Sequence, residues 1–145
     1  MVAAQIVSIP HTGTHFLRDL LLDHGVEITE FDHLDSLNFE YESFENIVAP
    51  VRPPREVAFS WGRIGRRVDH GWEEMWGRLK NLTAHFFFLE DKDVALRRLS
   101  DHLGITLSSD WERVNFSDME SPPFISESRI AMADNVYKAL RGQHG

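Results

Sequence analysis

The sequence contains no cysteine, which excludes disulfide bridges, thiolate metal sites and cysteine nucleophiles. It also contains no run of about 18 apolar residues, and its start, MVAAQIVSIP, lacks the basic region of a secretory signal. Positive charge is scarce, since 15 Lys and Arg residues stand against 23 Asp and Glu residues for a formal net charge of −8. Broad electrostatic binding to nucleic acid or to an anionic membrane is therefore disfavoured. We expect a cytoplasmic protein with neither of these partners.

The length of 145 residues is close to the commonest size of a single domain. Apolar residues make up 42% and charged residues 26%, which is typical of a folded chain rather than a disordered one. No internal repeat, low-complexity tract or linker divides the sequence. We therefore expect one domain over residues 1–145, and the oligomeric state stays open.

Short apolar runs alternate with segments of helical periodicity along the chain. Predicted strands cover residues 5–9, 26–31, 47–51 and 83–89, and predicted helices cover 16–25, 54–61, 68–82, 92–103 and 126–141. Strands that alternate with helices form right-handed crossovers, which give a parallel sheet buried on both faces. The pattern predicts an α/β fold. In such a sheet the loops at residues 10–14 and 52–55, beyond the carboxyl ends of two strands, are the expected ligand-binding segments.

The first of these loops lies within residues 8–17, SIPHTGTHFL, between a predicted strand and a predicted helix. It combines the glycine Gly13 with three side chains that can hydrogen-bond an anion, those of His11, Thr12 and Thr14. Amide groups at a helix start can bind the same anion, so the segment predicts a phosphate cradle. It is not a Walker A loop, because GxxxxGK[ST] is absent. The alternative is an ordinary helix start with threonine caps and a turn glycine.

The second loop places Arg52 at a strand end and Ser60 two turns into the following helix. An arginine supplies a bidentate fork and a serine supplies a hydroxyl donor, so the two side chains can converge on one phosphate. The alternative is an arginine at the surface and a serine on a helix face.

Together these segments resemble the sulfotransferases that use 3′-phosphoadenosine 5′-phosphosulfate (PAPS). SIPHTGTHFL is similar to the family's YPKSGTTWL loop, which holds the 5′-phosphosulfate. Residues 52–60, RPPREVAFS, match the family's R-N-P-[RK]-[DE]-V-x-x-S signature, which holds the 3′-phosphate. FFLED at 87–91, LSDHLG at 99–104 and VNFSDM at 114–119 resemble later family segments, so the likeness spans residues 5–124. It implies a P-loop-NTPase-like fold, a three-layer α/β sandwich with a central parallel sheet.

The resemblance also implies a set of functional residues. FDHLD at 31–35 is similar to the family's K-T-H-L-P segment, which makes His33 the base that takes the acceptor's proton, a task suited to imidazole. The alternative for His33 is a solvated loop histidine. A cationic His11 would stabilise charge on the transferred group. Implied contacts to PAPS, or to its product 3′,5′-bisphosphoadenosine (PAP), are His11, Thr12, Gly13, Thr14, His15, Phe16, Arg52, Ser60, Trp61, Phe116 and Met119, the last three around the adenine.

The chain departs from the family pattern at three places. His11 replaces a lysine, Leu89 replaces the tyrosine that contacts adenine, and residues 125–128 replace an Arg-Lys-Gly loop, for which Arg129 or Arg141 is the candidate substitute. We expect sulfuryl transfer to a hydroxyl or amine of a small-molecule or glycan acceptor. The alternatives are a non-catalytic nucleotide-binding homologue and a kinase-like phosphotransferase. The latter is disfavoured because the Walker lysine and an Mg²⁺-binding Asp after an apolar strand are missing.

Other polar and aromatic clusters are expected to be structural. Glu90 and Asp91 are interpreted as a buried hydrogen-bonding pair in which Asp91 caps the next helix. His11 and His15 lack a third ligand at useful spacing, so no metal site is expected. Trp72, Met75 and Trp76 lie at helical spacing and are interpreted as core or an acceptor-pocket wall, with a cofactor site as the alternative.

Overall fold

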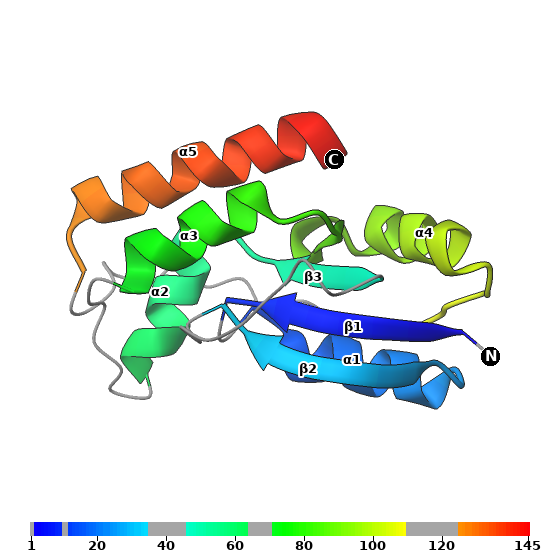
Figure 1. Ribbon diagram of the computed structural model, residues 1–145. Coiled ribbons are helices and arrows are strands. Elements are labelled where there is room, and N and C mark those ends of the chain that lie inside the picture. Colours follow the sequence, from blue (N-terminus) through cyan, green and yellow to red (C-terminus); the bar gives the residue numbers. More distant parts are fainter. Residues whose placement is uncertain (1, 10–11, 35–45, 64–70, 110–124) are drawn as a thin grey trace.

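The computed structural model describes residues 2–9, 12–34, 46–63, 71–109 and 125–145 (Figure 1). Within these ranges the chain forms a four-stranded parallel sheet in the order β2-β1-β3-β4. The strands are β1 (Ala3–Ser8), β2 (Glu27–His33), β3 (Ile47–Val51) and β4 (His85–Phe88). The helices are α1 (Thr14–Asp23), α2 (Pro54–Arg63), α3 (Gly71–Asn81), α4 (Lys92–Leu103) and α5 (Glu127–His144), with a short 3₁₀ turn η2 (Leu89–Asp91).

Helices cover both faces of the sheet, so successive strand residues are buried on opposite sides. Ala49 packs into a cluster with residues of α2, α3 and α5, whereas its neighbour Val48 packs into a second cluster with residues of α1 and α4. All five residues of β3 are buried. This double burial explains why the strand reads as an unbroken apolar run. The predicted α/β class with a parallel sheet is confirmed.

The element ends follow their local chemistry closely. α2 begins at Pro54, where a missing amide hydrogen costs nothing, and α4 is followed by Gly104, whose φ of 72° places it in the left-handed region and ends the helix. β2 runs two residues beyond its predicted end, because residues as far as His33 pair with β1. Among the described helices, none is long and apolar enough to cross a membrane.

The expectation for Glu90 and Asp91 is wrong in two respects. Glu90 is exposed, and its carboxylate accepts a hydrogen bond of 2.8 Å from the Tyr137 hydroxyl. Asp91 occupies the position before α4 but makes no side-chain cap; it forms an ion pair with Arg141 of α5 instead. Both partners are charged in the pair with Arg141, whereas a helix amide is neutral, so the guanidinium is the stronger partner for the carboxylate.

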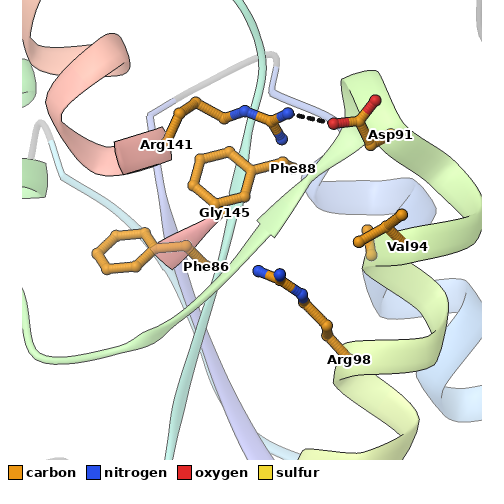
Figure 2. A pocket seen from close by; sticks show the side chains of 8 residues that line it. Phe86, Phe88, Asp91, Val94, Arg98, Arg141 and Gly145 are labelled. Carbon is orange, nitrogen blue, oxygen red and sulfur yellow. Dashed lines mark hydrogen bonds and ion pairs between the residues drawn. The ribbon is translucent and has the colours of Figure 1, made fainter. Parts of the chain in front are cut away.

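Figure 2 shows the surroundings of this ion pair. Arg141 reaches over the ring of Phe88, with 4.9 Å from its guanidinium carbon to the ring centroid, toward Asp91. The adjoining pocket holds only about 10 Å³, which is room for about one water molecule. The pair therefore ties η2 to α5 and forms no ligand site.

Neighbouring leucines on α1 give a direct test of the layered packing. Leu21 is fully buried, whereas Leu22 is 51% exposed. We expect Leu21→Ala to lower the free energy of unfolding by about 2–5 kcal/mol, because it leaves a cavity in the core. The matched control Leu22→Ala should change it by less than about 0.5 kcal/mol. Urea denaturation of both variants checks this, and equal losses would contradict the assigned faces.

Candidate functional site

A pocket of about 230 Å³ lies at the carboxyl edge of the sheet, toward which the strand arrows in Figure 1 point. It is lined by Gly13, Thr14, His15, Phe16, His33, Arg52 and Ser60. These residues come from the β1–α1 loop and helix start, the end of β2, the segment after β3, and α2. β1 and β3 are adjacent in the sheet, but the chain continues from β1 to β2 on one side and from β3 to β4 on the other. Ligands bind at such a reversal of strand order in open parallel sheets. The structure thus brings together seven residues that the two loops and the FDHLD segment had predicted.

The β1–α1 loop approaches the rest of the protein so closely that Gly13 is required there. Its φ of +87° lies in the left-handed region. A Cβ on Gly13 would collide with Cδ2 of Leu89, which is itself buried. Leu89 therefore packs beneath the loop and has no place among the pocket-lining residues. The carbonyl of Gly13 accepts the amide of Leu17 at 2.9 Å and so opens α1 beside the pocket.

The threonines on this loop have different tasks. Thr12 is buried, and its hydroxyl donates to the carbonyl of Ile9 at 2.7 Å. Its side chain therefore closes the loop on itself and does not line the pocket, in contrast to the predicted contact with PAPS. Thr14 lines the pocket, although it is only 3% exposed. The first amides of α1 have no partner within the helix and lie in this same stretch of chain.

His33 reaches the pocket from the end of β2. It pairs in register with Ser8 of β1, and the next amide, of Leu34, donates to the Ser8 carbonyl at 2.8 Å. The Phe31 ring lies between two histidines, with centroid distances of 5.4 Å to His15 and 6.1 Å to His33. Strand pairing and ring packing together hold the imidazole at the pocket wall.

Ser8 is a residue of the site that the sequence interpretation missed. It is fully buried, and its hydroxyl lies 2.7 Å from the Thr14 hydroxyl and 3.5 Å from Nδ1 of His33. The alternation of residues in β1 gave a signal that Ser8 is buried, because Ala4 and Ile6, on the same face of the strand as Ser8, belong to the core. A serine continuing a buried face needs a polar partner.

Arg52 is held at the pocket by a second residue that had no predicted role. Its Nη2 lies 3.5 Å from Oε1 of Glu56, one turn into α2, and the side chains are 13% and 0% exposed. A fully buried carboxylate requires a cation, so Glu56 fixes the guanidinium in place. Arg55, from the same motif, pairs instead with Glu127 at the surface. The hydrogen bond to Glu127 is the main cause that raises the pKa of Arg55.

Several predicted residues lie elsewhere or outside the described ranges. Trp61 is fully buried and packs edge-on against Trp72 in the core, so it lines no adenine site in the described part of the chain. The interpretation of Trp72, Met75 and Trp76 as core is confirmed. His11, Phe116 and Met119 fall outside the described residues, and their roles stay predictions.

The candidate substitutes for the basic loop are engaged away from the pocket. Arg129 forms a two-bond pair with Glu73, with distances of 2.5 Å and 2.7 Å, and Arg141 pairs with Asp91. Neither lines the pocket. In the described ranges no group of three or more His, Cys, Asp or Glu is placed to hold a metal ion.

His85 and His102 lie at the opposite edge of the sheet. They line a pocket of about 300 Å³ and stack with ring centroids 4.6 Å apart. Burial lowers the pKa of His85 to about 4, with further lowering by the charges of His102, Arg98 and His144. His85 is therefore neutral in the folded protein across the physiological range.

The loop glycine gives the second prediction. We expect Gly13→Ala to destabilise the protein by at least about 1 kcal/mol more than Gly25→Ala. Both glycines have positive φ, +87° and +78°, but a Cβ on Gly25 would meet nothing within 4 Å. The comparison isolates the contact with Leu89, so adding Leu89→Ala to Gly13→Ala should recover part of the difference. Equal losses by denaturant unfolding would show that the loop relaxes freely.

The pKa of His85 predicts how stability depends on pH. The unfolded chain binds a proton at this histidine near the ordinary value of 6.5, whereas the folded protein binds it only near 4. Between these values the unfolded state holds more protons, so the free energy of unfolding falls as the pH is lowered from about 6.5 to 4. His85→Phe should flatten that decline, while His24→Gln, outside the His85 cluster, should retain it. Urea titrations at several pH values measure both slopes, and parallel slopes would contradict the assignment.

Comparisons with known proteins leave the site to be interpreted from its own geometry. A scan against models of protein families found no match, and searches of curated proteins and of solved structures found no similar chain. The pocket, its donors and the two motifs that form it are therefore the basis for any assignment of function.

Proposed function

We propose that this chain transfers a sulfuryl group from PAPS to a hydroxyl or amine acceptor, on a P-loop-like sulfotransferase fold. The observation that carries the proposal is the shared pocket. The sequence assigned two motifs, about 40 residues apart, to the two charged ends of one donor molecule, and a histidine between them to the acceptor. Gly13, Arg52 and His33, which come from these three segments, line one cavity. Residues that close adjacent parallel strands meet at this edge whatever their type, so the support lies in which residues these are: a glycine loop at a helix start, a guanidinium and an imidazole.

The chemistry of the lining suits an anion. Hydroxyls of Thr14 and Ser60, the guanidinium of Arg52 and the helix start of α1 can all donate hydrogen bonds, and none of the lining residues that the structure describes carries a carboxylate. The donor set therefore fits the phosphate and sulfate groups of PAPS.

The size of the pocket indicates which part of the donor it holds. Its volume of about 230 Å³ is below the roughly 300–1,000 Å³ of sites that enclose a whole drug-sized ligand. We assign the charged groups to this pocket and the adenine to its surroundings, where Phe116 and Met119 remain the predicted contacts.

Each lining group has a task in the proposed reaction. When bound, PAPS supplies the sulfuryl group: its bond to the 5′-phosphate oxygen breaks as a bond to the acceptor forms, and PAP departs with the electron pair. The Gly13 amide and the Thr14 hydroxyl stabilise charge on the departing phosphate. His33 accepts the proton of the acceptor. Arg52 and Ser60 hold the 3′-phosphate and so orient the donor.

Loss of Arg52 should weaken PAP far more than AMP, which has no 3′-phosphate. Removing the arginine alone leaves Glu56 buried without its cation, which costs about 3–5 kcal/mol. The test variant is therefore the double substitution Arg52→Gln with Glu56→Gln. We expect PAP affinity to fall about 10- to 100-fold and AMP affinity to change less than about threefold. The matched control is Arg55→Gln, since Arg55 lies three residues away and outside the pocket.

Calorimetry with both nucleotides, followed by a transfer assay from PAPS to phenol, amine and glycan acceptors, decides the proposal. Equal weakening of PAP and AMP binding would contradict the assignment of the 3′-phosphate to Arg52. Tight PAP binding without transfer to any acceptor would favour the non-catalytic nucleotide-binding alternative. Binding of ATP–Mg²⁺ in place of PAP would favour the phosphotransferase.

A further inference from the structure

The Ser8 hydroxyl connects two pocket residues that come from different elements. It lies at the end of β1, fully buried, 2.7 Å from Oγ1 of Thr14 at the start of α1 and 3.5 Å from Nδ1 of His33 at the end of β2. Thr14 and His33 both line the pocket, whereas Ser8 does not. A hydroxyl has one proton to donate and can accept others, so this buried chain can be ordered in two directions.

The two directions give His33 different chemistry. If Thr14 donates to Ser8 and Ser8 donates to Nδ1, the proton of the neutral imidazole lies on Nε2, which then cannot accept another. If Nδ1–H donates to Ser8 and Ser8 donates to Thr14, Nε2 carries the lone pair and can act as a base. Through this contact at Nδ1, the direction of the hydroxyl chain therefore favours or disfavours the tautomer of His33 that can take a proton at Nε2.

We propose that Ser8 is a positioning residue through which an anion in the pocket sets the base-competent tautomer of His33. An anion accepts the proton of the Thr14 hydroxyl, so Thr14 can only accept from Ser8. Ser8 then accepts from Nδ1–H of His33. The catalytic consequence rests on the proposed function, but the coupling itself needs only an anion in the pocket. The donor thereby prepares the base before an acceptor reacts.

The coupling is measured by the nitrogen chemical shifts of the histidine rings, which report the tautomer directly. Protein with ¹⁵N-labelled histidine is titrated at about pH 8, where a histidine of ordinary pKa is neutral, first with inorganic phosphate and then with PAP. In the wild type we expect either anion to move His33 toward the Nδ1–H form. His24 is the internal control, because its ring contacts the Leu20 carbonyl and the Ser108 amide, away from the pocket.

Ser8→Ala removes the connecting hydroxyl with a small change in volume. We expect it to abolish the anion-dependent shift of His33 while PAP affinity stays within about threefold, since Ser8 lines no part of the pocket. Thr14→Val should abolish the shift as well, and Thr14→Ser, which retains the hydroxyl, should restore it. In the transfer assay Ser8→Ala should lower kcat about tenfold or more with little change in KM for PAPS.

Each result has a definite meaning. An unchanged response of His33 in Ser8→Ala, or anion binding that leaves the wild-type tautomer unaltered, overturns the role of Ser8 and leaves the sulfotransferase proposal standing. A response to phosphate without binding of PAP retains the role of Ser8 and overturns the proposed donor. If neither anion binds, both proposals fail. Should Ser8→Ala fail to fold, the Thr14→Val and Thr14→Ser pair makes the comparison at saturating anion, because Thr14 also contacts the anion directly.

Discussion

Parallel pairing of β1 with both β2 and β3 is the constraint on which the candidate site depends. Parallel strands end at the same edge, so whatever residues close them meet there without any further device. Ser8 and His33 are partners in the register of β1 and β2, and Arg52 follows the last residue of β3. An antiparallel neighbour would have carried one of these groups to the other edge, where His85 lies instead.

At this edge the core gives way to buried polar groups that lie beside polar or charged neighbours. Ser8 forms a hydrogen bond with Thr14, Thr12 donates one to the Ile9 carbonyl, and Glu56 forms an ion pair with Arg52. Leaving such a group without a partner costs more than the bond itself contributes, so the interactions penalise alternative loop positions more than they stabilise the native one. The loop is thus specified by polar satisfaction on one side and by the contact of Gly13 with Leu89 on the other.

Local sequence signals predicted the elements well because they are local in origin. The apolar run of β3 and the proline that begins α2 needed no knowledge of the rest of the chain. The role of Asp91 depended on Arg141, 50 residues later, and periodicity cannot reveal that partner. Trp61 was assigned to the adenine through the resemblance, whereas the structure buries it against Trp72 of another helix, a partner that its own segment does not reveal. Ser8 was overlooked because its importance arises only when β2 brings His33 beside it.

β2 is the outermost strand on one side of the described sheet, next to β1. Its composition suits that exposed position. Glu27, Thr29 and Glu30 are exposed, so the open edge carries two carboxylates rather than an apolar ribbon. An unpaired strand edge is a template for joining another chain, and like charges on two copies repel such pairing. The carboxylates on the strand that carries His33 thus disfavour edge-to-edge pairing of two copies along β2.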